Sequence, residues 1–241
     1  MRVELTVSEI LSYLSCPHRY WLDQLEERTP QTPAQAIGSA IAAAQYWRVH
    51  HGERDPKALT DVALVHWLRT SNENGYSEGS WIKGRKAIPG AVAAMLRSIP
   101  ERECRAEVSM ACVVTHPQYP DIVIAVRGRA DLVGAGWIAD LKVGREIRDN
   151  SYVRQLALYA MMSDDKMLSR GVVHNVYKTG EKYRHRAIEH LLTQGVMDAA
   201  RSIAYNVGRA VIAGIDTPCS ELAWWCSRMW CARWEGCAVR K

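Results

Sequence analysis

Two aspartates and a lysine interrupt the apolar segment "GRADLVGAGWIADLK", in which short stretches of strand-forming residues flank a glycine turn. Asp140 and Lys142 are two residues apart, so on a strand their side chains face the same side, and antiparallel pairing would bring Asp131 beside them. Converging carboxylates repel each other unless a divalent cation lies between them, and oxygen ligands favour Mg²⁺ or Mn²⁺. A lysine alongside can orient a water molecule and stabilise negative charge at phosphorus.

The alternative for this D-x-K tripeptide is an exposed ion pair at the end of a hairpin, which would contribute little to stability. The surrounding residues favour the metal site. Glu107 lies one predicted strand earlier, where it is either a further acidic ligand or a solvated strand residue. Gln155 and Tyr159 follow on a predicted helix, and a spacing of four places them on one face.

Cysteines form a second group with metal-binding chemistry. The chain has seven, of which Cys226, Cys231 and Cys237 lie close together near the C-terminus and Cys16 lies far earlier, before Pro17. In a cytosolic protein, clustered thiols indicate metal ligation, catalysis or burial rather than disulfides. Tetrahedral thiolate coordination needs a fourth ligand besides the three that cluster here.

Length and composition are those of an ordinary globular protein: 241 residues, 48% hydrophobic and 24% charged. The net charge of +5 permits a nucleic-acid partner without establishing one. No apolar run is long enough to span a bilayer, and the N-terminus lacks the basic start and apolar block of a signal peptide. We therefore expect a cytoplasmic protein with no membrane partner.

The periodicity of apolar residues changes along the chain. Helical spacing predicts helices over 6–27 with a break near Cys16, over 34–51, and twice between 55 and 100. Alternating and β-branched residues then predict strands, followed by further mixed elements. The expected elements are strands 106–116, 121–133 and 136–142, helix 151–162, strand 170–179 and a long helix over 186–213.

The order "GRADLV", "IADLKVG" and "QLALYA" resembles the active-site core of the PD-(D/E)XK nuclease superfamily, and most of all RecB-like and CRISPR-associated iron–sulfur exonucleases. The resemblance implies an α/β fold: a mixed central sheet flanked by helices, with a restriction-endonuclease-like core. It also implies roles for the residues of this site. Asp131, Asp140 and the Leu141 carbonyl would bind Mg²⁺ or Mn²⁺, with Glu107 as an additional acid. Lys142 would be the catalytic lysine, and Gln155 and Tyr159 would lie near the scissile phosphate.

The same iron–sulfur exonucleases carry one N-terminal and three C-terminal cysteines around a [4Fe–4S] cluster. By resemblance, Cys16, Cys226, Cys231 and Cys237 would be its ligands, closing the Cys-rich C-terminal segment on the N-terminal helix. Five residues separate Cys231 from Cys237, as in that family, but four rather than two separate Cys226 from Cys231. A zinc site with the same ligands and unligated buried thiols are the alternatives.

One expected metal ligand is missing. Relatives carry a His in a G-x-x-x-H pattern on the helix before the sheet, and here Gly38 is followed by Ala42 at that position. His50 is eight residues further on, about 12 Å along the helix, which is too far to replace it. Three interpretations of Ala42 are open. The site works without this ligand, or the protein is a weakened or inactive relative. The third is that a His→Ala change was introduced to trap an inert complex.

The sequence therefore predicts one integrated domain: a helical region over 1–100, a nuclease core over 101–215 and a Cys- and Trp-rich segment over 216–241. The expected function is metal-dependent hydrolysis of DNA, as an exonuclease on single strands or duplex ends. The resemblance implies proteins of a CRISPR-adaptation or recombination complex as partners. The alternative is a non-catalytic DNA-binding or adaptor subunit with the same fold.

Overall fold

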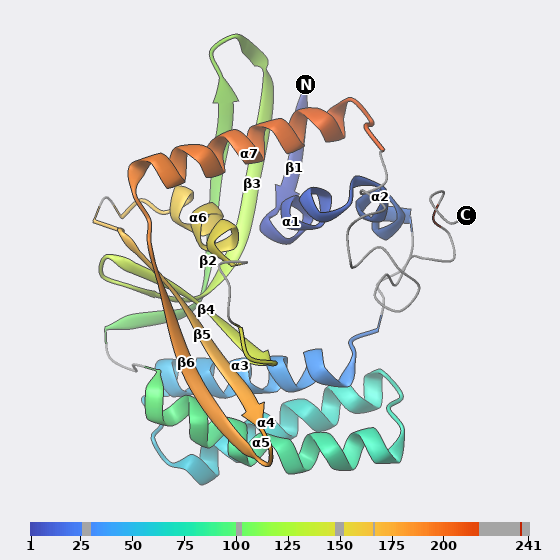
Figure 1. Ribbon diagram of the computed structural model, residues 1–241, viewed down its shortest axis with the longest axis vertical. Helices are drawn as coiled ribbons and strands as arrows, with labels where there is room; N and C mark the ends of the chain where they lie inside the picture. The colour runs from blue at the N-terminus through green and yellow to red at the C-terminus, as the bar shows by residue number, and fades with distance from the viewer. Residues whose placement is uncertain (26–29, 100–102, 148–151, 166, 217–236, 238–241) are drawn as a thin grey trace.

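The computed structural model describes residues 1–25, 30–99, 103–147, 152–165, 167–216 and 237 (Figure 1). Its elements combine one mixed sheet with helices on both of its faces, as the sequence predicts. In chain order they are β1 (Arg2–Thr6), α1 (Val7–Ser15), α2 (Pro17–Leu25), α3 (Pro33–His51), α4 (Pro56–Glu73), α5 (Glu78–Ser98), β2 (Cys104–His116), β3 (Tyr119–Gly134), β4 (Trp137–Gly144), α6 (Val153–Met161), β5 (Arg170–Thr179), β6 (Lys182–Leu191) and α7 (Gln194–Ile212).

The six-stranded sheet has the order β1-β3-β4-β5-β6, with β2 paired to the other edge of β3. β1 runs parallel to β3 and β4 parallel to β5, whereas the other pairs are antiparallel. β1 and β4 share one edge of β3: pairing with β1 ends at Arg127 and pairing with β4 begins at Leu132. Residues 128–131 therefore lie where the sheet divides, without a strand partner on that edge among the described strands.

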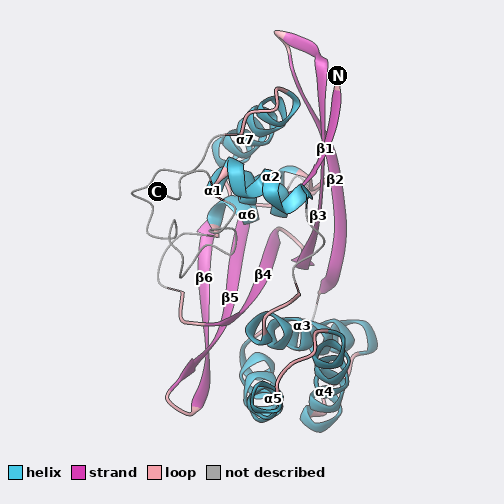
Figure 2. Cartoon of the chain, turned by 90° about the vertical axis from the view of Figure 1, so that its right-hand side faces the viewer, coloured by secondary structure: helices cyan, strands magenta, loops and turns pink. Residues whose placement is uncertain are grey.

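Two apolar cores cover the two faces of the sheet. Leu5, Ile124 and Val173 belong to the core under α1, α6 and α7, and Leu132, Ala139 and Val172 belong to the core under α3, α4 and α5. Figure 2 shows the α3–α5 bundle and the α1, α6 and α7 group as separate layers. Strands that contribute side chains to both cores are held on both faces, which fixes the backbone of β3 and β4.

The predicted helix break at Cys16 is confirmed. Thr6 and Glu9 form the capping box of α1, with Thr6 N donating to Glu9 Oε2 at 2.6 Å. Cys16 has an extended backbone, with φ −163° and ψ 107°, between the end of α1 and Pro17 at the start of α2.

Among the described helices, none is both long and apolar enough to cross a membrane.

The long helix predicted over 186–213 is wrong in its first part. Residues up to Leu191 belong to β6, which pairs with β5 across a turn at Gly180, where φ is +59°. The side chain of Thr193 caps α7 by accepting a hydrogen bond from Val196 N, so the helix begins only at Gln194. β6 is an edge strand with alternating half-buried residues, and its many charged residues hide that alternation. The short strand β1 was not predicted either.

Candidate active site

The three acidic residues singled out in the sequence lie in one row across three strands. Leu132 pairs with Ala139, so the next positions in register are Asp131 on β3 and Asp140 on β4. Glu107 on β2 lies opposite Asp131, because the pairs Ala106–Leu132 and Val108–Ala130 flank it. Glu107 has φ +54°, a left-handed conformation that is rare outside glycine and that concentrates at functional sites.

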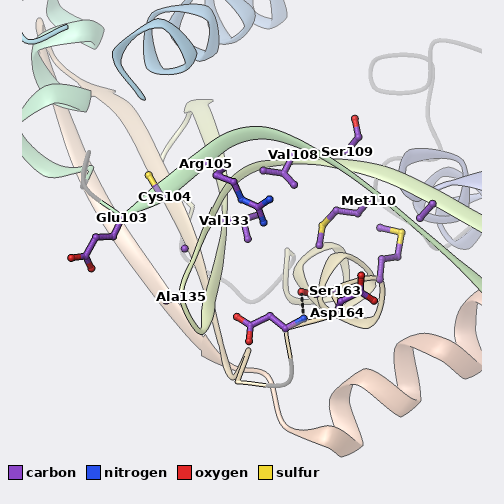
Figure 3. Close-up of a pocket in the computed structure, with 14 residues that line it drawn as sticks. Glu103, Cys104, Arg105, Val108, Ser109, Met110, Val133, Ala135, Ser163 and Asp164 are labelled. Atoms are coloured by element: carbon purple, nitrogen blue, oxygen red, sulfur yellow. Dashed lines mark hydrogen bonds between the residues drawn. The ribbon is translucent and has the colours of Figure 1, made fainter. Parts of the chain in front are cut away.

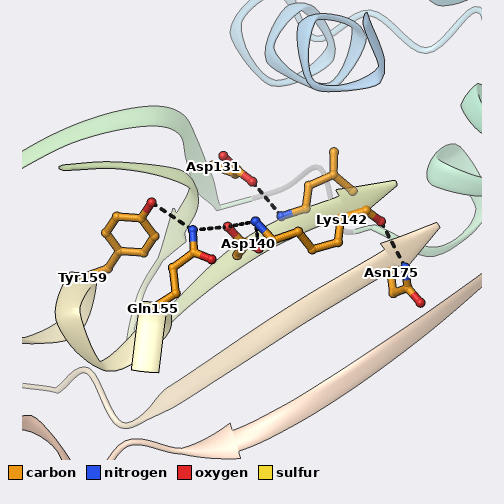
Figure 4. Close-up of polar contacts among 7 residues, drawn as sticks. Asp131, Asp140, Lys142, Gln155, Tyr159 and Asn175 are labelled. Atoms are coloured by element: carbon orange, nitrogen blue, oxygen red, sulfur yellow. Dashed lines mark hydrogen bonds and ion pairs between the residues drawn. The ribbon is translucent and has the colours of Figure 1, made fainter. Parts of the chain in front are cut away.

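Asp140 is the centre of a hydrogen-bonded network (Figure 4). Lys142 Nζ lies 3.0 Å from Asp140 Oδ1 and 2.8 Å from Oδ2, with hydrogen-bond geometry to Oδ1 alone. Gln155 Nε2 donates to Asp140 Oδ1 at 2.9 Å and to the Tyr159 hydroxyl at 3.2 Å. The structure thus joins the D-x-K tripeptide of β4 to the Gln and Tyr of α6, one turn apart on the face that the spacing predicts.

Asp131 has fewer compensating contacts than Asp140. Its Oδ2 accepts a hydrogen bond of 2.6 Å from Leu141 N. Burial, and next the charge of Asp140, raise the pKa of Asp131 to about 7. Asp140 is only 2% exposed, and burial raises its pKa too, against the opposing effect of Lys142. A buried and a half-buried carboxylate that share one lysine are short of positive charge, which favours a cation between them.

Lys142 is held in place by residues that the sequence analysis missed. Burial acts to lower the pKa of Lys142, but attraction to Asp140 and Asp131 outweighs it and raises that pKa. The Lys142 ammonium lies 5.1 Å from the centre of the Tyr152 ring, a cation–π contact. Asn175, 1% exposed on β5, donates to the Lys142 carbonyl at 3.2 Å. A lone Asn within "GVVHNVY" was the available signal, since a buried amide must be hydrogen-bonded.

Asp131, Asp140, Lys142, Gln155 and Tyr159 line one cleft with a volume of about 1070 Å³. One wall consists of residues of β2, β3, β4 and α6, and the other consists mainly of residues of α3 and α4. Ala42 lies on the α3 wall and lines the same cleft as Asp131 and Asp140. The residue at the position of the expected His therefore faces the site.

Comparisons with known proteins fit this geometry. The sequence matches the profile of the PD-(D/E)XK nuclease superfamily over residues 4–240. This chain belongs to the PD-(D/E)XK nuclease superfamily. No curated protein sequence matches the chain at a significant level.

A solved structure shares the fold of this nuclease-family chain. A candidate exonuclease from Eubacterium rectale superposes with a TM-score of 0.65 and 14% identity, covering 99% of this chain and 89% of that one. Weaker likenesses are the protein SSO0001, with a TM-score of 0.49, 12% identity and coverage of 99% and 87%, and Rai1 from Scheffersomyces stipitis, with a TM-score of 0.29, 9% identity and coverage of 88% and 70%. The first likeness confirms the predicted mixed α/β architecture.

The nuclease-family site offers few protein ligands for a metal ion. Among the described residues, no three His, Cys, Asp or Glu side chains lie close enough together to hold one. Glu107 Oε2 instead lies 2.5 Å from Arg129 Nε, so this carboxylate is engaged in an ion pair. The donors that remain are Asp131, Asp140 and main-chain carbonyls, an all-oxygen set of the kind that Mg²⁺ and Mn²⁺ accept with several water ligands.

Two further hollows lie beside the cleft. One, of about 790 Å³, shares Asp131, Arg129 and Tyr159 with it and extends to the start of α1. The other, of about 670 Å³, lies between β2, the β3–β4 turn and the end of α6 (Figure 3). Its described lining includes Cys104 and Asp164 but none of the residues predicted to do chemistry, so the candidate chemistry belongs to the larger cleft.

The predicted cluster ligands are only partly within the described residues. Cys16 is buried, and its Sγ accepts a hydrogen bond of 3.4 Å from Arg19 N. Cys237 is half-buried, and Cys226 and Cys231 lie outside the described residues. The chain after α7 returns to the neighbourhood of Cys16: the Ile215 carbonyl accepts hydrogen bonds from the Tyr13 hydroxyl and Trp21 Nε1, both at 2.9 Å.

Proposed function

We propose that this chain is a metal-dependent deoxyribonuclease that removes nucleotides from single strands or duplex ends. The observation that carries the proposal is the single cleft lined by Asp131, Asp140, Lys142, Gln155 and Tyr159. Superfamily membership supports hydrolysis of nucleic acid, and the exonuclease-like fold of the Eubacterium rectale protein supports action at ends.

Asp131, Asp140 and the Leu141 carbonyl would hold Mg²⁺ or Mn²⁺. The fit rests on the all-oxygen donors and on the shortage of positive charge between the two carboxylates, in which Asp140 Oδ2 is buried and has the Lys142 ammonium 2.8 Å away but no hydrogen bond. When bound, such an ion stabilises charge on the phosphate and lowers the pKa of a coordinated water.

The side chains of the chain itself perform the remaining tasks. Lys142 is fixed between Asp140 and the Tyr152 ring, so its ammonium can orient the attacking water and donate to a phosphate oxygen. Gln155 holds Asp140 Oδ1 with one amide hydrogen and the Tyr159 hydroxyl with the other, so it positions both groups. The Tyr159 hydroxyl keeps the Gln155 amide in this orientation. Burial raises the pKa of Tyr159, so it remains a neutral donor.

The residue at position 42 is proposed to determine whether the nuclease is fully active or weakened. A His in place of Ala42 would project from α3 into the cleft that Asp131 lines, and would add a nitrogen ligand. The alternative function, a non-catalytic DNA-binding subunit, is favoured by this Ala together with the absence of a three-ligand group among the described residues.

We also propose that Cys16, Cys226, Cys231 and Cys237 hold a [4Fe–4S] cluster, with zinc as the alternative metal. The buried Cys16 and the return of residues 215 and 216 to α1 and α2 support it, as does the 2.8 Å pair between His18 Nδ1 and Asp216 Oδ1. Anaerobically purified protein should be brown and contain iron. A colourless protein that contains zinc would overturn the cluster.

Cleavage of end-labelled single-stranded DNA in Mn²⁺ tests the nuclease proposal. The comparison uses the chain as it stands, an Ala42→His variant and an Ala42→His/Lys142→Ala variant that lacks the proposed catalytic ammonium. The proposal predicts shortening of the labelled strand by Ala42→His. Cleavage by Ala42→His no faster than by the doubly substituted protein would leave the binding subunit as the function.

A further inference from the structure

Helix α3 changes character along the cleft. Its first part presents small residues to the cleft and its next turn presents large rings, and together these six are Gly38, Ser39, Ala42, Ala43, Tyr46 and Trp47. Residues four apart on a helix lie one above the other. Tyr46 therefore follows Ala42, and Trp47 follows Ala43, along two adjacent rows of the cleft wall.

Both rings are partly exposed, and each contacts a histidine ring of the same helix. Tyr46 is 38% exposed and Trp47 is 41% exposed, although such side chains gain most from burial. The Tyr46 ring centre lies 4.3 Å from that of His50, and the Trp47 ring centre lies 4.0 Å from that of His51. Each aromatic ring thus contacts an imidazole one turn further on, at interplanar angles of 42° and 35°, and both aromatic residues line the cleft. Exposed aromatic rings that line an open cleft are suited to stack with a flat ligand.

Charged side chains of both signs line the cleft. Lys142 and Arg129 line it from the sheet side and Arg69 lines it from α4, and each contacts a carboxylate: Asp140, Glu107 and Glu73 respectively. The rings suit a ligand with planar apolar faces, and the proposed nuclease function makes that ligand a nucleic-acid strand, whose bases have such faces. In a duplex the base faces are stacked within the helix, so the rings can receive only unpaired bases.

We propose that Tyr46 and Trp47 form a base-stacking platform for unpaired nucleotides of a DNA strand whose backbone passes Asp131 and Asp140. The identity of the occupant rests on the proposed nuclease function. Tyr46 is one turn, about 6 Å, from Ala42 along α3, so the platform lies within a few nucleotides of the acidic residues. The substrate class that follows is a single-stranded end, and a duplex end enters only where its terminal pairs have opened.

The test measures binding without cleavage, by fluorescence anisotropy in a metal chelator. The probes are an oligothymidine and an oligonucleotide of the same length and charge that carries abasic sites in place of bases. A Tyr46→Ala/Trp47→Ala variant should bind oligothymidine about 10-fold or more weakly than the original chain, because each stacked base contributes through its ring. Its affinity for the abasic strand should change by less than about twofold, because the phosphate contacts remain.

Two matched variants distinguish stacking from general damage to the cleft. Tyr46→Phe/Trp47→Phe retains the rings and should bind oligothymidine nearly as the original chain does. Val65→Ala removes an aliphatic side chain, 67% exposed, that lines the same cleft. This variant should bind both probes with the affinity of the original chain. An equal loss in the Phe and Ala double variants would overturn the platform, since retained rings would then not retain affinity.

The base-stacking proposal and the nuclease proposal can be contradicted independently of each other. Unchanged oligothymidine binding by Tyr46→Ala/Trp47→Ala overturns the platform even if the protein cleaves DNA, and so does the absence of any binding by the original chain. Base-dependent binding that the double variant loses supports the platform even if no variant cleaves, in which case the nuclease proposal alone is lost.

Discussion

The wall of the cleft formed by β3, β4 and α6 carries charge and hydrogen bonds, whereas the α3 wall carries small residues and exposed rings. On the first wall, Asp140 contacts both Lys142 and Gln155, and Asn175 holds the main chain behind them. On the second, Ala42 and Tyr46 leave space and an open aromatic surface. The difference suggests a division of tasks. Chemistry is placed where sheet pairing fixes the backbone, and strand binding is placed on a helix whose surface is free.

The largest effect should follow loss of charge from the sheet wall. In an Ala42→His background, Lys142→Ala should slow cleavage of single-stranded DNA by about 10²–10⁴-fold, the range of a positioned proton donor or acceptor. Lys178→Ala, a change at an exposed lysine on β5, should leave the rate unchanged. Equal rates for the two variants would show that the sheet wall does not carry the chemistry.

The sheet also contains a close pair of histidines, of which His174 on β5 is buried and His185 on β6 is half-buried. His174 Nδ1 lies 3.0 Å from His185 Nε2, and burial, with the charge of His185, lowers the pKa of His174 to about 4. The folded protein therefore binds fewer protons than the unfolded chain between about pH 6.5 and 4, so this pair makes stability fall as pH falls through that window. Between pH 7 and pH 4, His174 should therefore lower the free energy of unfolding by roughly 3 kcal/mol.

Urea unfolding of the original chain and of His174→Gln from pH 7 to 4 measures this contribution. The variant should lose less stability than the original chain over the window, because one proton uptake on unfolding is removed. Parallel curves for the two proteins would contradict a neutral buried His174.

The same substitution should have opposite effects on stability in strand β3 and in helix α3. A Cβ at Gly128 on β3 would lie 2.8 Å from Tyr159 Cε1 and 2.9 Å from Val7 Cγ2, whereas a Cβ at Gly38 on α3 would have no atom within 4 Å. Gly128→Ala should cost about 1–3 kcal/mol of unfolding free energy and displace Tyr159. Gly38→Ala should add up to about 1 kcal/mol, because alanine favours a helix. Thermal unfolding compares them, and a destabilised Gly38→Ala would show that the α3 wall is not open.

A smaller effect is expected at the junction between Asp140 and α6. Gln155→Ala removes a hydrogen bond to Asp140 while Lys142 remains in contact, so the cleavage rate in the Ala42→His background should fall by about 10-fold. Replacement of Gln194, an exposed glutamine at the start of α7, is the matched control. A loss as large as that of Lys142→Ala would assign Gln155 a part in the chemistry beyond positioning.

Much of the sheet wall could be predicted from sequence because its signals are local. Strand alternation places Asp140 and Lys142 on one side, and helical spacing places Gln155 beside Tyr159, which the hydrogen bonds among them confirm. The opposition of Asp131 and Asp140 needs only a tight turn between two strands. These features depend on few residues, so short segments were enough.

Features that depend on distant segments could not be predicted. Asn175 reaches Lys142 only because β5 pairs parallel to β4, and local sequence does not specify this pairing. The polar edge strand β6 was taken for the beginning of a helix, since its alternation is masked by charge. Tyr46 and Trp47 line the cleft only because α3 packs against β4 and β2, which a helical pattern alone does not reveal.

The most direct test of the account asks whether the two walls form one catalytic site. Cleavage of end-labelled single-stranded DNA in Mn²⁺ is measured for the original chain, Ala42→His, Asp131→Asn and the double variant. We predict that Ala42→His raises the rate about 10-fold or more and that Asp131→Asn abolishes this gain, because both side chains serve one site. An equal gain with and without Asp131, or no gain in either background, would contradict the account.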